Sequence, residues 1–144
     1  MERSDRENGK RVVIVHASNE REIDAAIASI VQQRASALLV ASDGLFRSHS
    51  DQLIALPARY SLPASYSDRE YVVAGGLMSY GPSIADGYRQ CGVYAGQILK
   101  GKNPGDLPVL QPTKFEFVIN RTTAKVLGLT IPAGVLSIAD EVIE

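Results

Sequence analysis

Asp43 is the residue whose type and position most favour ligand chemistry. It follows a short apolar segment at residues 37–41 and stands between Ser42 and Gly44. A carboxylate at that point can accept charge-assisted hydrogen bonds from the ammonium or hydroxyl groups of a ligand. The same residue can instead cap the helix that follows or close an Asx turn. Both interpretations stay open at the level of the sequence.

A second polar group, Asp68, Arg69 and Glu70, follows the next apolar segment. An arginine beside two carboxylates can bind the carboxylate of a ligand in bidentate fashion, although such a trio also serves as a solvated helix start. Tyr66 and Tyr80 flank this region. Their rings can form an aromatic wall for a solute or pack half-buried inside the domain.

The residue types that catalysis and metal binding require do not occur in a recognisable arrangement. His16 and His49 are the two histidines and lie on different segments, and Cys91 is the single cysteine. One cysteine permits neither an intrachain disulfide nor a thiolate metal cluster. The sequence has no G-x-S-x-G elbow, H-E-x-x-H pair, phosphate-binding loop or G-x-G-x-x-G fingerprint. We therefore expect no catalytic residue, no metal site, no cofactor and no enzymatic activity.

The composition is that of one globular domain. Hydrophobic residues make up 45% and charged residues 22% of the 144 residues. With 15 basic and 16 acidic side chains, the chain lacks the basic surplus of nucleic-acid-binding proteins. No apolar run reaches the roughly 18–20 residues of a membrane span. Residues 1–10 are polar, which predicts a disordered tail without an export signal, and hence a cytoplasmic chain if expressed as written.

Apolar segments alternate with helical patterns along residues 11–144. Strands are predicted at residues 11–16, 37–41, 63–66 (as an edge strand) and 114–119, and helices at about 18–34, 48–59, 67–70, 83–100, 122–127 and from 132. Pro57 is expected to kink or shorten its helix. This alternation predicts an α/β domain with a mostly parallel sheet flanked by helices. Ligands of such sheets bind beyond the carboxyl ends of the strands, here near residues 16–19, 42–46 and 66–70.

Several segments, in this order, resemble the ABC transporter substrate-binding protein family, which includes solute binders of the tryptophan/tyrosine type. The segments are ALLVASD at 37–43, DQLIAL at 51–56, YVVAGGLMSYG at 71–81, YRQCGVYAGQILKG at 88–101 and LPVLQPTKFEFVIN at 107–120. The resemblance covers about residues 11–144, and the AGGLMSYG and QPTKFE blocks are its most specific parts.

The resemblance implies a type I periplasmic-binding-protein fold, a two-lobed clamshell that is periplasmic or membrane-associated, binds a small-molecule solute such as an amino acid between its lobes, and serves an ABC permease. Residues 11–144 would be a truncated second lobe, with residues 77–112 crossing to the lobe that this chain lacks. Asp43 would hold a polar or amino group of the solute. The binding residues that the resemblance implies are Ser42, Asp43, Tyr66, Asp68, Arg69, Glu70, Tyr80 and Gly81.

Two consequences follow from a missing lobe. The helix at residues 83–100 would expose its apolar stripe, so we expect it to fold back on its own sheet or to be covered by a second copy in a homodimer or domain swap. One wall of a two-walled site would bind solute weakly or not at all. A truncated remnant, or the ligand-sensing lobe of a regulator or receptor, remains an alternative, because the same clamshell serves several functions.

Overall fold

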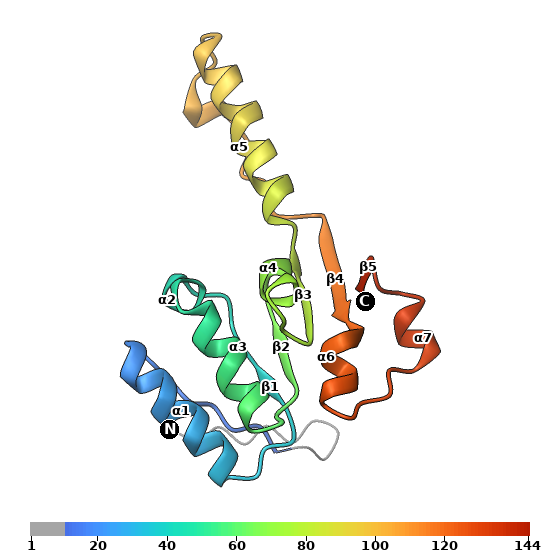
Figure 1. The fold of residues 1–144 in the computed structure, drawn as a ribbon. Helices are drawn as coiled ribbons and strands as arrows, with labels where there is room; N and C mark the ends of the chain where they lie inside the picture. Colours follow the sequence, from blue (N-terminus) through green and yellow to red (C-terminus); the bar gives the residue numbers. More distant parts are fainter. Residues whose placement is uncertain (1–10) are drawn as a thin grey trace.

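The computed structural model describes residues 11–144 (Figure 1), so the tail predicted at residues 1–10 lies outside the described residues. The strands are β1 (Leu38–Leu39), β2 (Ala64–Tyr66), β3 (Met78–Pro82), β4 (Phe115–Asn120) and β5 (Glu141–Ile143). The helices are α1 (Glu20–Gln32), α2 (Gly44–Ser48), α3 (Ser50–Arg59), α4 (Arg69–Val73), α5 (Ile84–Leu99), α6 (Arg121–Val126) and α7 (Ala133–Leu136), with a short 3-10 turn, η1 (Pro104–Asp106).

The strands form one sheet in the order β1-β2-β3-β4-β5. Strands β1, β2 and β3 are parallel, β4 is antiparallel to β3, and β5 is parallel to β4. The predicted mostly parallel α/β sheet is therefore confirmed. The prediction that residues 63–66 form an edge strand is wrong, because β2 pairs with a strand on each side.

This topology brings five chain segments to one edge of the sheet. The carboxyl ends of β1, β2 and β3 and the amino ends of β4 and β5 lie there, because the last two strands run in the opposite direction. Helix α5 leaves the sheet from the same edge, directly after β3 (Figure 1). We call this side of the sheet, with the strand ends and loops that lie there, the α5 edge. The loops after β1 and β2, where the sequence places candidate ligand residues, both open onto it.

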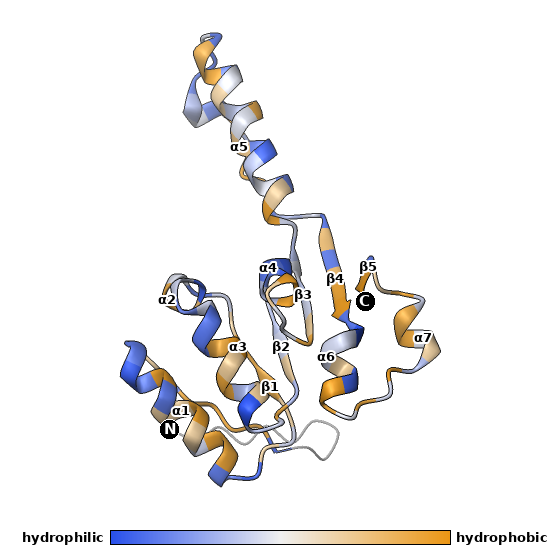
Figure 2. Cartoon of the chain, in the orientation of Figure 1, coloured by the Kyte–Doolittle hydropathy of each residue, from blue (hydrophilic) through white to orange (hydrophobic). Residues whose placement is uncertain are grey.

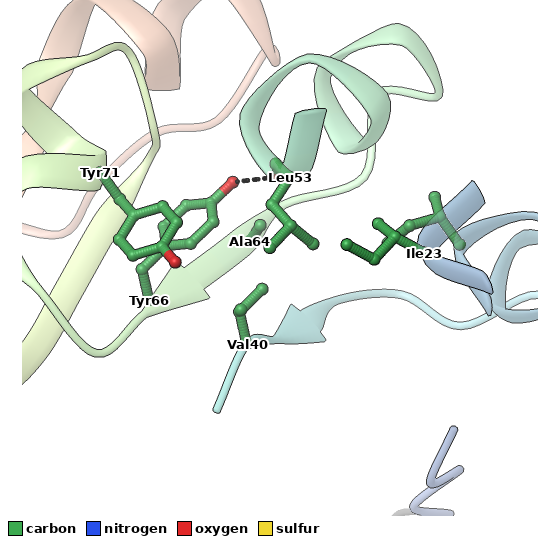
Figure 3. Packing of buried hydrophobic residues seen from close by; sticks show 7 residues of the cluster. Ile23, Val40, Leu53, Ala64, Tyr66 and Tyr71 are labelled. Atoms are coloured by element: carbon green, nitrogen blue, oxygen red, sulfur yellow. Dashed lines mark hydrogen bonds between the residues drawn. The ribbon is translucent and has the colours of Figure 1, made fainter. Parts of the chain in front are cut away.

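The main core joins α1 and α3 to the first strands (Figure 3). Its buried members are Ile23, Ile27, Val40, Leu53, Ala64, Tyr66 and Tyr71. Helix α1 begins where the sequence predicts, since the side chain of Asn19 accepts a hydrogen bond from the Glu22 amide. Its apolar stripe then faces the core at helical spacing. These helices fix the positions of the loops that follow β1 and β2.

The strand predicted at residues 11–16 does not form. Val12 and Ile14 are 50% and 45% exposed, and residues 11–17 belong to no strand. Four consecutive apolar residues favour an extended backbone, but a strand also requires a hydrogen-bonded neighbour. Strand β1 is only two residues long and pairs with β2 alone among the described strands, so it offers little edge for another strand.

Helix α5 projects away from the sheet (Figure 1) and has no buried residue. Figure 2 shows apolar residues at intervals along its length; Val93, Ile98 and Leu99 are solvent-exposed, and so is the ring of Tyr88. The returning segment lies beside it, with the Tyr94 hydroxyl donating to the carbonyl of Pro108. The expectation that α5 folds back on its own sheet is therefore wrong. Within the described residues, Tyr88 and Leu99 stay largely uncovered, at 72% and 87% exposed.

Candidate functional site

Asp43 lies at the α5 edge, because it follows the strand predicted at residues 37–41 and the carboxyl end of that strand reaches this edge. It is the N-cap of α2, and its Oδ1 atom accepts a hydrogen bond from the Leu45 amide at 2.7 Å. The capping interpretation therefore applies. The residue is also exposed, and its second carboxylate oxygen makes no hydrogen bond to the described residues. Neighbouring Ser42 is exposed as well. Asp43 can thus cap α2 and still offer an oxygen to a ligand.

Asp68 follows β2 and is almost fully buried at the same edge. Its Oδ2 atom accepts a hydrogen bond from Nη2 of Arg47 at 2.7 Å, with 49% of the Arg47 side chain exposed against 5% for Asp68. Asp68 raises the pKa of Arg47 through this bond, against a smaller opposing effect of burial. Sequence reasoning missed Arg47, which lies one residue beyond the loop that the strand rule indicates. The pair ties the loop after β1 to the loop after β2.

Arg69 points away from this pair and toward the end of the sheet at β5. Its Nε and Nη2 atoms donate to the two carboxylate oxygens of Glu141 at 2.6 and 2.7 Å. The ion pair raises the pKa of Arg69 and lowers that of Glu141, with the hydrogen bond as the largest cause of both shifts. The bidentate clamp predicted for a ligand carboxylate is thus occupied by the protein's own glutamate. Glu70 is exposed in the first turn of α4.

Tyr66 lies in the core rather than in the wall of a cleft, with 2% of the residue exposed. Its ring stacks on Tyr71 at a centroid distance of 4.7 Å, and its hydroxyl donates to the carbonyl of Leu53 at 3.0 Å (Figure 3). Burial raises its pKa well above the usual range, with Tyr71 adding to the shift. Alternation along β2 turns this side chain toward α3, so the structure gives it a packing role.

Tyr80 belongs to an aromatic group on one face of β3 and β4. Its ring stacks on Phe115 at 5.7 Å and meets Phe117 edge-on at 6.4 Å. Tyr80 pairs with Phe117 on the neighbouring strand, and Pro82, two residues later, pairs with Phe115. All three aromatic residues therefore lie on the same face of the sheet. Tyr80 is 62% and Phe115 46% exposed, so much of this surface is free to contact another molecule.

Gly81 is buried because another loop lies directly against it. A Cβ atom at this position would meet the carbonyl oxygen of Ser67 at 1.9 Å. Any larger residue would push β3 away from the loop that carries Asp68. Gly81 therefore contributes to the site by allowing this close approach.

A cavity of about 280 Å³ opens at the β4–β5 end of the α5 edge. It is lined by Arg69, Lys114, Phe115, Glu116, Val118, Asp140 and Glu141. Its charged groups are largely paired with one another or with the backbone: Lys114 lies 3.8 Å from Glu116, and Asp140 accepts from the Phe117 amide.

Among residues 11–144, no group of three or more His, Cys, Asp or Glu side chains is placed to hold a metal ion. No helix in that range is long and apolar enough to cross a membrane.

Comparisons with known proteins identify the family. The ABC transporter substrate binding protein family matches residues 2–143. A tyrosine-binding protein of Clostridioides difficile is 28% identical over 124 residues, which cover 86% of this chain and 36% of that protein. The chain thus spans little more than a third of this curated relative.

Two solved structures share the fold. A conserved domain protein from Vibrio cholerae superposes with a TM-score of 0.85 at 28% identity, covering 93% of this chain and 45% of the other. An ABC domain from Streptococcus pneumoniae, in complex with L-Trp, gives a TM-score of 0.79 at 29% identity, with coverages of 88% and 44%. Each match therefore uses less than half of the solved chain. From the family match over nearly its whole length, this chain belongs to the ABC transporter substrate binding protein family.

Proposed function

We propose that this chain forms the carboxyl-terminal half of a two-lobed solute receptor of an ABC import system and supplies one wall of its solute site. The receptor would act outside the cytoplasmic membrane and pass its solute to a permease. The observation that carries the proposal is the α5 edge, where Ser42 and Asp43 in the loop after β1 are exposed and α5 extends beyond the sheet without a buried residue. The coverage of 44–45% of the solved relatives supports the same architecture.

We take the solute to be an amino acid with an aromatic side chain. At the α5 edge, Asp43 offers a carboxylate oxygen to an ammonium group. The exposed rings of Tyr80 and Phe115 offer a surface on which an aromatic side chain can stack. The tyrosine-binding relative and the neighbour in complex with L-Trp support this solute class.

The apolar stripe of α5 would pack on the other half of the receptor. Exposed Tyr88 and Leu99, 72% and 87% accessible, are the residues that such packing would cover. A second copy of this chain could cover them instead, as a domain swap. Static light scattering of the chain between micromolar and millimolar concentration separates the two, because a monomer at all concentrations contradicts the swap.

A single wall should bind its solute weakly. A site with a Kd near 1 μM stabilises its complex by about 8.2 kcal/mol, and half of that corresponds to a Kd of about 1 mM. An NMR titration of the ¹⁵N-labelled chain with L-tryptophan is suited to this range. We expect the amide signals of residues 42–47, 67–71 and 80–81 to shift together. Shifts confined to the cavity at the β4–β5 end, or no shifts at any accessible concentration, would contradict the proposal.

Asp43→Asn gives a sharp test of the ammonium contact. Asparagine caps helices as well as aspartate does, so the variant keeps the bond to the Leu45 amide while it loses the charge. We expect about a tenfold loss of L-tryptophan affinity, the effect of one charge-assisted hydrogen bond, with little change in stability. Asp51→Asn, in the first turn of α3, is the matched control and should bind as the wild type does.

A further inference from the structure

Arg47 presents unused hydrogen-bond donors at the α5 edge. A guanidinium group has five N–H donors. In the described residues, only Nη2 of Arg47 makes a hydrogen bond, to Asp68, and half of the side chain is exposed. Asp68 is 4% exposed and fixed at the start of α4, so it holds one side of the guanidinium group in place. The other side remains open to a ligand.

The charged groups around Arg47 form one neighbourhood. Tyr71 is 3% exposed and its ring is fixed by stacking on Tyr66, yet its hydroxyl makes no hydrogen bond to the described residues. Burial is the main cause that raises its pKa; the charges of Asp68 and Asp43 raise it further and that of Arg47 lowers it. The Arg47–Asp68 ion pair and Asp43, at the other end of α2, therefore both influence the Tyr71 hydroxyl electrostatically.

We propose that Arg47, oriented by Asp68, binds the carboxylate of an α-amino acid whose ammonium group is bound by Asp43. This inference rests on the proposed function and names the part of the solute that this half of the receptor binds. Arg47 and Asp43 stand four residues apart at the ends of α2, with opposite charges that match a zwitterion. Asp68 acts through Arg47 and is a positioning residue.

The other arginine at the α5 edge is already paired with a carboxylate of the protein itself. Arg69 gives two donors to Glu141 in a bidentate pair, so binding of a ligand carboxylate there would require breaking that pair. Arg47 instead keeps its buried partner when it binds a ligand, because different N–H groups serve the two carboxylates. The structure thus moves the carboxylate-binding role from Arg69 to Arg47.

The test compares L-tryptophan with L-tryptophanamide, in which a neutral carboxamide replaces the carboxylate, by NMR titration of the ¹⁵N-labelled 144-residue chain. The wild type should prefer the acid, and its Arg47 Nε–H signal should shift with the acid alone. Arg47→Gln should weaken acid binding about tenfold or more while changing amide binding less than about twofold, because it removes one charge-assisted contact. Arg47→Lys, which keeps the charge, should retain part of the preference.

Two further variants separate positioning from folding. Asp68→Asn should reduce the preference for the acid without removing the charge of Arg47, a change that a merely structural residue would not produce. Arg59→Gln, in the last turn of α3, is the matched control and should leave both affinities unchanged. Thermal unfolding checks that each variant is folded.

Each remaining result has a defined meaning. If the acid binds at the α5 edge of the wild type but Arg47→Gln binds it equally well, the role of Arg47 is refuted and the proposed function stands. Equal losses for acid and amide also refute that role. If neither compound binds the wild type at any accessible concentration, both proposals fail.

Discussion

Removing the Tyr66 hydroxyl should leave a buried backbone carbonyl of α3 without a hydrogen-bond donor. Pro57 lies inside this helix and has no N–H group, so the carbonyl of Leu53, four residues earlier, lacks its helical partner. Leu53 is 4% exposed, and the Tyr66 hydroxyl donates to this carbonyl at 3.0 Å. Tyr66→Phe keeps the ring and its stacking on Tyr71 but leaves the carbonyl without a donor. The proline is thus tolerated because a side chain from β2 replaces the missing hydrogen bond.

The expected cost follows from the burial of that carbonyl. Leaving a buried acceptor unsatisfied costs about 1–3 kcal/mol. Unfolding entropy near 2.1 cal/mol/K per residue gives about 0.3 kcal/mol/K for 144 residues, so Tm should fall by roughly 3–10 °C.

A double-mutant cycle in urea unfolding isolates this bond. Pro57→Ala supplies an N–H group to the Leu53 carbonyl, so Tyr66→Phe should cost less in the Pro57→Ala background than in the wild type. We expect a coupling of about 1 kcal/mol, which is within the range for residues that share a partner. Circular dichroism at constant pH measures the four unfolding free energies. An equal cost of Tyr66→Phe in both backgrounds would refute the reasoning, because the hydroxyl would then stabilise the fold by some route other than the orphaned carbonyl.

Three further predictions concern the same edge and core. Gly81→Ala should lower the free energy of unfolding in urea by about 1–3 kcal/mol, because the added Cβ would collide with the Ser67 carbonyl. An unchanged free energy of unfolding would contradict the packing described. Burial raises the pKa of Tyr66 in the folded protein, so the stabilisation linked to this shift is fully present below the unfolded-state pKa of 10.0 and is lost as the pH rises above it. Tyr66→Phe should lessen this loss of stability in alkali, measured as the free energy of unfolding over a series of pH values. Arg69→Gln should cost less than about 1 kcal/mol, because both partners of its pair are 40% exposed, and should speed amide exchange in β5. Since Arg69 lowers the pKa of Glu141, this cost should be present above pH 4.5 and vanish as the pH falls below it, and a cost that persists in acid would exclude the ion pair as its source.

The candidate site was only partly predictable from the sequence. The strand rule places Asp43 beyond the carboxyl end of a strand, where the structure has it, because a polar residue after a short apolar run lies at the end of a strand in a parallel sheet. It cannot distinguish Arg69 from Arg47, since the partner of Arg69 is Glu141, 72 residues later. An ion pair over such a separation depends on the β4–β5 pairing, which no local pattern encodes.

Local patterns alone also misjudged the ends of the sheet. The apolar run at residues 11–16 has strong strand propensity but gains no hydrogen-bonded neighbour in the structure. Strand β5 has only three residues and little local signal, yet it forms because β4 offers a free edge. Strand formation in both places is decided by pairing rather than by propensity.

By itself, the sequence determined the class of the domain, the helices with clear apolar periodicity and caps, and the resemblance to ABC transporter substrate binding proteins. These features depend on residues close together in the chain, whose spacing fixes which face is apolar. Only the tertiary structure decided that Tyr66 packs inward, that Arg69 is held by Glu141, that Asp68 presents Arg47 at the α5 edge, and that α5 stands free of its own sheet. Each of these depends on contacts between distant segments, because the direction of a side chain at a strand end is set by what packs against it.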